Sequence, residues 1–266
     1  MKNRILLVVC LLCLSVLSVL FLYHFRVEAD PRTHETVDAA SFSHDLFDQV
    51  LQEHTDTEGR MNYAKLKANP EKLEQYLDIL AVANPTELSY NAQLAFWVNA
   101  YNALVIKGVI DHYPTMSVRK VKWFGGFFYR LKFQVAGKTY TLNQIEHDII
   151  RQNFVDPRVH FVLVCASSSC PPIENRAFSA EDIEERLETA TFNFIQNPEN
   201  IKFDRDKRRV YLSKIFEWYK TDFYEGYDGV VDFLADYLPP EDADFGSAAD
   251  IEFHYLDYDW TLNDKR

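Results

Sequence analysis

The stretch NAQLAFWVNAYNALVIKGVIDH, residues 91–112, decides the fold of this chain. Its apolar side chains fall on nearly all sides of a helical projection, which is typical of a helix buried in the middle of a domain. Asn99, Asn102 and Lys107 interrupt the run, so we expect a central buried helix and not a membrane span. Tyr113-Pro114 follows the run and favours a helix end.

The patterns on both sides of this stretch predict an α+β domain, with helices packed around a small, mostly antiparallel sheet. Apolar residues at helical spacing predict helices in residues 42–53, 70–80, 142–152, 179–196, 216–223 and 230–237. Thr141 with Gln144 matches a capping box at the start of the third of these. Strands are predicted in residues 61–65, 159–165 and 251–256, and hairpins in residues 131–142 and 201–212. No internal repeat or boundary divides residues 41–266, which we interpret as one domain.

The N-terminus carries the features of a targeting segment. Lys2 and Arg4 precede an apolar run from Ile5 to Tyr23, which is just long enough to span a bilayer. Val27-Glu28-Ala29 then offers a cleavage site. Residues 1–29 are therefore predicted to be a signal peptide or an uncleaved membrane anchor, with the anchor slightly favoured, and residues 30–40 a linker.

This segment predicts a location in the cell envelope, either membrane-anchored or periplasmic or secreted. Membrane contact is expected through residues 5–23 if they are not removed. A lipoprotein signal needs a small residue before its cysteine, and neither Val9-Cys10 nor Leu12-Cys13 supplies one.

The charge of the chain bears on its partners. The formal net charge is −12, and without residues 1–29 there remain 25 basic and 39 acidic side chains, a net of −14. Such a surface repels nucleic acid phosphates and anionic lipid headgroups, so neither is an expected partner. No cofactor is expected.

Five strings of this sequence, taken together, resemble the family called domain of unknown function 547. They are NAQLAFWVNAYNALVIKGVIDHYP, TLNQIEHDIIR, DPRVHFVLVCASSSCPPI, LSKIFEWYKTDF and LDYDWTLND, which occur in the family's order and cover most of residues 57–264. The family is found in bacterial envelope proteins and in plant proteins. The resemblance implies a thiol-hydrolase-like role and a fold with papain-like or transglutaminase-like features. Plant members resemble this chain at Cys165 but tend to carry serine at the position of Cys170, so the resemblance does not imply a disulfide throughout the family.

Cys165 is the candidate nucleophile. It ends the predicted strand 159–165 and precedes the small-residue loop Ala166-Ser167-Ser168-Ser169. A loop beyond a strand end exposes a sulfur and offers backbone N–H groups for an oxyanion. A cysteine nucleophile also needs a base within hydrogen-bond reach.

The base is predicted to be His147. In a regular strand, His160 would lie about 16 Å from Cys165 on the opposite face, which excludes it. The helix that carries His147 can fold back against the strand, with Glu146 inside its apolar stripe and His147 at the edge. The predicted catalytic set is therefore Cys165, His147 and Glu146, with Glu146 or an asparagine as the orienting group. Adjacent helical residues diverge by about 100°, which weakens a direct Glu146–His147 contact.

Other interpretations of the same residues stay open. Cys165 and Cys170 are the only cysteines outside the apolar N-terminal segment, and in an oxidising compartment they could form a structural disulfide. Cys165 could also be an inert buried thiol. His147 could be structural, and Glu146 could pair with Arg151 or Arg158. No metal is expected, because a zinc site of Cys165, Cys170 and His147 does not have the spacing of a known finger or ribbon.

Several polar and aromatic side chains are candidates for substrate binding. Asn99 and Asn102 are three residues apart and share a helix face. They could position a substrate, or their amides could tie neighbouring loops to the core. The aromatic stretch 123–129 could form a rim, although core filling is the favoured role for most of it. Glu217, Trp218, Tyr219 and Asp222 mix aromatic and acidic groups as a carbohydrate cleft would. The predicted substrate-binding residues are Asn99, Asn102, Tyr101, Ser169 and Tyr219.

Two functions follow from these observations. The first is an envelope hydrolase or acyl/amide transferase that uses Cys165 and His147 on a peptide or cell-envelope substrate. The second is a non-catalytic envelope module that binds a peptide or a glycan, with Cys165 and Cys170 as a structural pair.

Overall fold

The computed structural model describes residues 42–122 and 125–265, which belong to one compact unit. The predicted targeting segment in residues 1–29 and the predicted linker in residues 30–40 lie outside the described residues, as do Trp123 and Phe124. In the described ranges, no helix has the length and hydropathy needed to cross a membrane.

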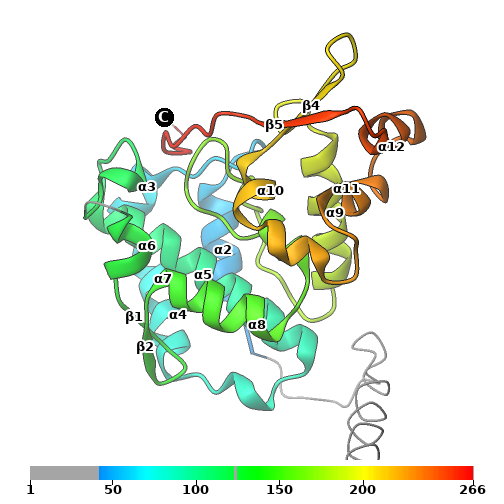
Figure 1. The fold of residues 1–266 in the computed structure, drawn as a ribbon. Coiled ribbons are helices and arrows are strands. Elements are labelled where there is room, and N and C mark those ends of the chain that lie inside the picture. The colour runs from blue at the N-terminus through cyan, green and yellow to red at the C-terminus, as the bar shows by residue number, and fades with distance from the viewer. Residues whose placement is uncertain (1–41, 123–124, 266) are drawn as a thin grey trace, which may run out of the picture. The chain divides into compact units, whose positions relative to one another are not determined.

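The predicted α+β class is confirmed: helices dominate, and the strands form two small sheets (Figure 1). The α-helices are α2 (Asp45–His54), α3 (Tyr63–Ala68), α4 (Glu71–Val82), α5 (Tyr90–His112), α6 (Gly126–Arg130), α7 (Leu142–Gln144), α8 (Arg151–Asn153), α9 (Ile183–Gln196), α10 (Lys214–Trp218), α11 (Val230–Ala235) and α12 (Pro240–Ser247). The 3₁₀ turns are η1 (Pro85–Glu87), η2 (Val118–Lys120), η4 (Pro157–Phe161) and η5 (Lys220–Tyr224). A π-helical segment, η3 (Ile145–Ile150), joins α7 to α8.

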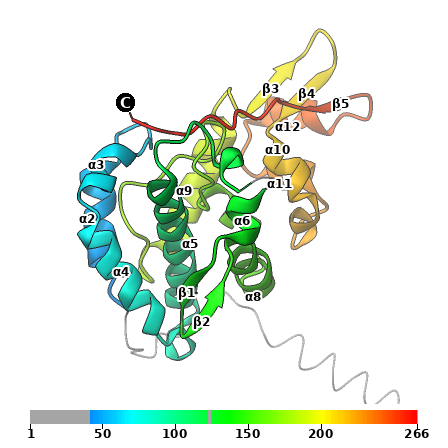
Figure 2. The same cartoon turned by 90° about the vertical axis from the view of Figure 1, so that its left-hand side faces the viewer.

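The central buried helix predicted from residues 91–112 is α5. It is capped by the Ser89 hydroxyl, which accepts from the Ala92 N–H, and 16 of its 23 residues are buried. Helices α3, α4, α7 and α9 all pack against it, as Figures 1 and 2 show. Gly108 allows one close approach, because a Cβ there would lie 2.9 Å from the Phe127 ring of α6. Helix α5 therefore organises the helical half of the domain.

The strands lie at the periphery of the domain (Figure 2). Strands β1 (Phe133–Val135) and β2 (Lys138–Tyr140) form an antiparallel hairpin. Strands β3 (Ile201–Asp204), β4 (Arg209–Leu212) and β5 (Glu252–Tyr255) form a three-stranded sheet in the order β3-β4-β5, in which β4–β5 is parallel. The two predicted hairpins and the predicted C-terminal strand are thus confirmed.

Two predicted strands are wrong. Residues 61–65 enter helix α3, because the Asn62 side chain accepts from the Lys65 N–H and caps a helix there. Residues 159–165 begin in the 3₁₀ turn η4, which Asp156 caps and Pro157 starts, and then continue without regular structure. Nearly all side chains of this run are buried. In such a run, apolar and polar residues do not alternate, so the pattern cannot distinguish a strand from other buried structure.

The core consists of two hydrophobic clusters. One surrounds α5 and the helices next to it, and the other gathers phenylalanines from η4, α9, α10, η5 and α11. Residues 256–265 leave β5 and cross the top of the domain to the helical half (Figures 1 and 2). There the Asn263 carbonyl accepts from the Met61 N–H at 3.1 Å, and the Asn263 N–H donates to the Ala166 carbonyl at 3.3 Å. The C-terminal segment therefore ties together parts of the chain that are distant in sequence.

Candidate functional site

A cavity of about 760 Å³ lies where residues of both hydrophobic clusters meet. Its size is that of a pocket for a small ligand. Its walls come from α5, residues 118–119 and 125–129, α7, η3, η4, the segment 163–171, α10 and the C-terminal segment. The residues that line it are Tyr101, Val118, Arg119, Gly125, Phe128, Tyr129, Asn143, Glu146, His147, His160, Leu163, Cys165, Cys170, Pro171, Ile215, Trp218, Tyr219, Tyr258 and Trp260.

Cys165 is a partly buried free thiol on the wall of this cavity. Its Sγ lies 2.9 Å from the Ser167 Oγ and 3.1 Å from the Tyr258 Oη. The next residue, Ala166, has a φ of 58°, a left-handed conformation that costs a non-glycine residue about 1–2 kcal/mol. Such strain is stored where the surroundings fix the backbone, and it often accompanies functional sites.

Hydrogen bonds make this sulfur acidic. Burial alone would raise the pKa of Cys165, but hydrogen bonds from Cys170, Ser167 and Tyr258 outweigh it and lower the pKa below the ordinary value. The partner thiol behaves in the opposite way, because burial and the neighbouring Cys165 sulfur raise the pKa of Cys170 well above its ordinary value. Burial likewise raises the pKa of Tyr258, so its hydroxyl stays protonated and can donate. We call Cys165, Ser167, Cys170 and Tyr258 the thiol cluster.

Neighbouring segments hold the loop that carries the thiol cluster. The N–H groups of Ser168, Ser169 and Cys170 donate to backbone carbonyls of Thr261, Asp259 and Ser167 at 2.8, 3.2 and 3.1 Å. These three amides are therefore already paired and do not face a substrate, contrary to the expectation of an oxyanion site made by loop amides. The hydroxyl of Tyr258, which lines the cavity 3.1 Å from the sulfur, is a donor that can take this role.

A glycine positions the chain beyond the thiol cluster. Gly59 has a φ of 72°, and a Cβ there would lie only 2.3 Å from the Pro172 Cβ. The Ile173 N–H donates to the Gly59 carbonyl at 3.1 Å. The glycine thus allows the segment after Cys170 to pack against the turn before α3.

Glu146 is buried, as its place in the apolar stripe predicts, and two tyrosines satisfy it. The Tyr101 hydroxyl donates to Oε2 at 2.9 Å, and the Tyr219 hydroxyl donates to Oε1. Burial and the Glu146 carboxylate raise the pKa values of both tyrosines, so both stay protonated donors. Tyr101 and Tyr219 therefore replace Arg151 and Arg158 as the expected partners of this carboxylate.

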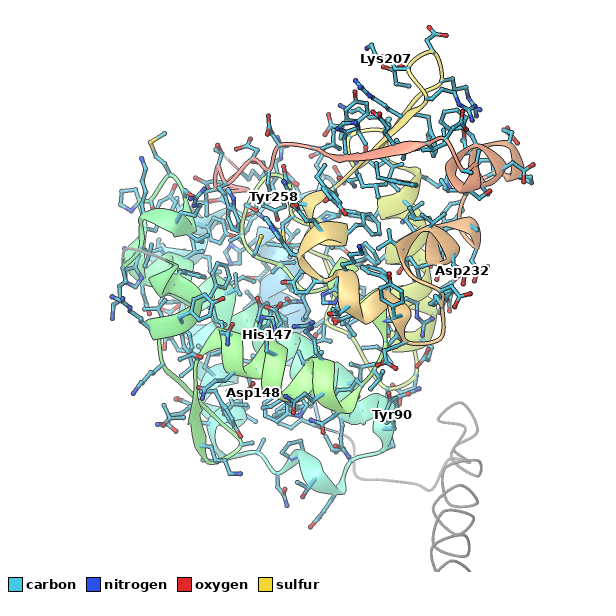
Figure 3. The ribbon with its side chains drawn as sticks, viewed as in Figure 1. Tyr90, His147, Asp148, Lys207, Asp232 and Tyr258 are labelled. Carbon is cyan, nitrogen blue, oxygen red and sulfur yellow. The ribbon has the colours of Figure 1, made fainter. Side chains whose placement is uncertain are left out.

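His147 lies on η3 and faces the same cavity. Its Nε2 is 3.8 Å from the Glu146 Oε1, closer than adjacent residues of a regular helix were expected to come. Arg151 donates to its Nδ1, so the neutral ring carries its proton on Nε2. Figure 3 labels His147 on this helix and Tyr258 on the C-terminal segment.

Arg151 and His160 share a second carboxylate, Asp222. Arg151 binds both oxygens of Asp222, and the His160 Nε2 lies 2.7 Å from Oδ2. Burial alone would raise the pKa of Asp222, but the hydrogen bonds from His160 and Arg151 hold it well below its usual range. The His160 ring stacks on Tyr219 with centroids 3.8 Å apart. We call Glu146, His147, Arg151, His160 and Asp222 the charged network.

The argument that excluded His160 from the site is wrong. It assumed a regular strand over residues 159–165, whereas η4 and the irregular segment after it place both His160 and Cys165 on the cavity. In the described residues, no imidazole nitrogen of His147 or His160 is within hydrogen-bond distance of the Cys165 Sγ. The sulfur is therefore activated by hydroxyl and thiol donors, and the role of His147 as its base stays a prediction.

Three of the five predicted substrate-binding residues do not line the cavity. Asn99 bridges the backbone of Phe178, and Asn102 bridges Val162 and Val164, with donor–acceptor distances of 2.8–3.0 Å. Ser169 accepts from the Asp259 N–H at 2.9 Å. Their amides and hydroxyl tie loops to the core, and Asn102 fixes the segment that leads into Cys165. Tyr101 and Tyr219 do line the cavity.

Three further residues of the site were not singled out from the sequence as functional. Tyr258 and Ser167 contact the thiol, and Arg119 lies at the exposed edge of the cavity, 5.6 Å from the Trp260 ring centroid. Trp218, Tyr258 and Trp260 form an aromatic wall with ring centroids 4.7–5.7 Å apart. Tyr258 and Trp260 belong to the string LDYDWTLND, whose density of aromatic and polar residues was the available signal.

Possible metal ligands do not cluster in the part of the chain that the structure describes. In residues 42–122 and 125–265, no group of three or more histidine, cysteine, aspartate or glutamate side chains is placed to hold a metal ion. Cys165, Cys170 and His147 share the cavity but do not form such a group.

The model of one protein family matches part of the chain. Residues 85–195 match the family described as protein of unknown function, DUF547, and this range includes Glu146, His147, Cys165 and Cys170. This segment belongs to the DUF547 family. The DUF547 segment supplies one side of the cavity, whereas Tyr219, Asp222, Tyr258 and Trp260 come from beyond residue 195. Comparisons with curated proteins and with solved structures gave no match, so the papain-like or transglutaminase-like features stay a prediction.

Proposed function

We propose that this protein is a thiol-dependent hydrolase or acyl/amide transferase, with Cys165 as its nucleophile and a peptide or cell-envelope substrate. The observation that supports this most is a free sulfur on the wall of a ligand-sized cavity, surrounded by donors that lower its pKa. A thiolate is the nucleophilic form of cysteine, and a partly exposed thiolate is poised to attack a carbonyl carbon. The location in the envelope is part of the proposal and rests on the features of residues 1–29.

The residues around the sulfur can be given roles in acyl transfer. The Cys165 thiolate attacks the carbonyl carbon, and the Tyr258 hydroxyl donates to the oxygen on which charge develops. His147, held by Arg151 with its proton on Nε2, donates a hydrogen bond from this N–H to the leaving amine or alcohol, which takes a proton from water as the acyl thioester forms. Water or a second amine then attacks the thioester, restores the thiolate and releases its proton to solvent. Glu146 and Arg151 are positioning residues in this scheme.

The test uses the full chain and two acyl donors, p-nitrophenyl acetate and an acetyl thioester. We expect a burst of released product and an acetyl group on Cys165, found by mass spectrometry of the fragment that contains it. Cys165→Ala should lower the rate by about 10³-fold or more. Cys10→Ser and Cys13→Ser are the matched controls, because they remove thiols of the N-terminal segment and should leave the rate unchanged.

His147→Ala separates activation of the thiol from stabilisation of the leaving group. Because hydroxyls and Cys170 activate the sulfur, the variant should still be alkylated by iodoacetamide at near the normal rate. Acyl turnover should fall by about 10²-fold, the usual contribution of one hydrogen-bond donor to charge that develops in the transition state. An unreactive Cys165, or an acyl group found on another residue, would overturn the proposal.

The aromatic wall favours a second candidate function, a module that binds a peptide or a glycan without chemistry. Trp218, Tyr258 and Trp260 offer stacking faces, and the Trp218 side chain is 45% exposed. This function predicts binding of a ligand to Cys165→Ala with unchanged affinity and no acyl transfer by the wild-type protein. Measurable acylation of Cys165 decides against it.

A further inference from the structure

The cavity contains a second thiol within reach of the first. The loop from Cys165 to Cys170 turns back on itself, because the Cys170 N–H donates to the Ser167 carbonyl at 3.1 Å. This turn places the Cys170 Sγ 2.8 Å from the backbone nitrogen of Cys165. Both cysteines are free, both are partly exposed, and both line the cavity. The acyl-transfer scheme gives Cys170 no chemical step.

Fixed backbone on either side holds the two thiols together. Just before Cys165, the Asn102 side chain hydrogen-bonds the Val162 carbonyl and the Val164 N–H. Beyond Cys165, the N–H groups of Ser168 and Ser169 donate to carbonyls of the C-terminal segment. The Cys170 side chain also hydrogen-bonds the side chains of Cys165 and Tyr258, and its contact with the Leu163 carbonyl is long, at 3.8 Å. The closest contacts of the Cys170 sulfur therefore hold it on the side that faces Cys165.

We propose that Cys165 and Cys170 are a thiol–disulfide exchange pair, in which Cys165 attacks a small-molecule disulfide that enters the cavity and Cys170 resolves the adduct. The unequal acidity of the two sulfurs supports these roles. Cys165, with its lowered pKa, supplies the attacking thiolate, and Cys170, with its raised pKa, stays a protonated thiol until the adduct forms.

The exchange balances with the disulfide as oxidant. The Cys165 thiolate attacks one sulfur of the small-molecule disulfide, whose S–S bond breaks, and one thiolate leaves. Cys170 then loses its proton to solvent and attacks the Cys165 sulfur, and the second thiolate leaves. Two protein thiols have become one disulfide, and one external disulfide has become two thiols.

This pair goes beyond acyl transfer and also controls it. The exchange needs no acyl substrate, so it does not depend on the proposed function. The disulfide form has no Cys165 thiolate, however, and cannot form an acyl thioester. In an oxidising compartment the pair would therefore hold the acyl-transfer site inactive until a thiol reduces it.

The test equilibrates the full chain in glutathione buffers of different ratios, blocks free thiols and analyses the products by mass spectrometry. Trypsin cleaves after Arg158 and Arg176, so one fragment contains Cys165 and Cys170 and excludes Cys10 and Cys13. We expect this fragment to lose two hydrogens reversibly as oxidised glutathione increases. In Cys170→Ser, the reaction should stop at a glutathione adduct on Cys165. Cys170→Ala is a second variant for the case in which serine disturbs the fold.

Three outcomes would overturn the proposal that Cys165 and Cys170 are an exchange pair. The wild-type protein could accumulate the glutathione adduct on Cys165 and never resolve it. Cys165→Ser could acquire an adduct on Cys170 as fast as the wild-type protein does on Cys165. The disulfide could persist in a large excess of reduced glutathione, which would make it a structural staple.

The two proposals fail separately. Acetylation of Cys165 without an internal disulfide removes the exchange pair and keeps the acyl transferase. A reversible disulfide without acetylation does the reverse.

Discussion

The thiol cluster and the charged network line the same cavity but hold their reactive groups in different ways. Around the Cys165 sulfur, all the contacts come from neutral donors, namely two hydroxyls, a thiol and an N–H group. In the charged network each carboxylate is bound by two side chains, two tyrosines at Glu146 and an arginine and a histidine at Asp222. The comparison indicates that the network fixes the cavity wall, whereas the cluster tunes one sulfur. A change in one region should therefore leave the other largely intact.

The largest expected effect on stability comes from Asp222→Asn. The amide cannot balance the charge of Arg151, and it has one accepting oxygen for the two groups, Arg151 and His160, that contact Asp222 in this partly buried site. The variant should lose about 2–3 kcal/mol of unfolding free energy, measured by urea denaturation at pH 7. The pH dependence of Cys165 alkylation should stay as in the wild-type protein. A parallel shift in thiol reactivity would show that the two regions are not independent.

The same variant gives a pH test. The pKa of Asp222 is depressed in the folded state, so its contribution to stability is complete above the unfolded value of about 3.9. As the pH falls below this value, the unfolded chain takes up a proton that the folded protein does not, and the contribution is lost. The stability difference between wild type and Asp222→Asn should therefore be constant from pH 7 to about 5 and shrink below pH 4. A difference that grows in acid contradicts the ion pair.

Tyr258→Phe is the complementary change. It removes one donor from the Cys165 sulfur and keeps the ring in the aromatic wall. The thiolate should become less favourable by about 1.4 kcal/mol, so the pKa of Cys165 should rise. The measurement is the rate of iodoacetamide alkylation between pH 5 and 9. Unfolding free energy should change by only about 1 kcal/mol.

The matched control for this variant is Tyr224→Phe, because Tyr224 is exposed and does not line the cavity. It should leave the alkylation profile unchanged. If Tyr258→Phe also leaves the profile unchanged, the donors around the sulfur do not set its acidity, and the thiol cluster loses its proposed role.

Much of the fold could be predicted from the sequence, because its strongest patterns are local. The nearly all-apolar α5 and the Thr141–Gln144 capping box depend on neighbouring residues, and both are observed. The segment 159–165 shows where local pattern fails: a run that is buried on every side has no periodicity to identify it. The same failure removed His160 from the expected site, because the distance estimate required a strand.

The thiol cluster could be predicted only in part. The position of Cys165 before a small-residue loop identified the nucleophile candidate, and the stripe of η3 identified Glu146 as buried. The partner of the thiol, Tyr258, is 93 residues away and is brought near by the C-terminal segment. No local pattern encodes such a contact. The amide groups of Asn99 and Asn102 were correctly expected to need partners, and the partners turned out to be backbone.

The smallest expected effect separates the edge of the cavity from its interior. Arg119 is exposed at this edge, beside Trp260, and makes no ion pair with a described residue. Lys120 has the same charge and is also exposed, but does not line the cavity. Iodoacetate and iodoacetamide are probes of similar shape that differ in charge, so the ratio of their rates at Cys165 reports the local field. Arg119→Gln should lower the relative rate of iodoacetate by about threefold, which corresponds to about 0.6 kcal/mol for an exposed charge.

Lys120→Gln should change this ratio by much less, and Arg119→Lys should restore most of it. The effect should also weaken at high salt, because an exposed charge is screened. This result would show that the edge of the cavity differs from both regions of its interior. There the Arg119 charge would favour ligands that carry an anionic group. Equal effects of Arg119→Gln and Lys120→Gln would instead show that only the general charge of the surface matters, since the two side chains differ in their access to the cavity and not in charge.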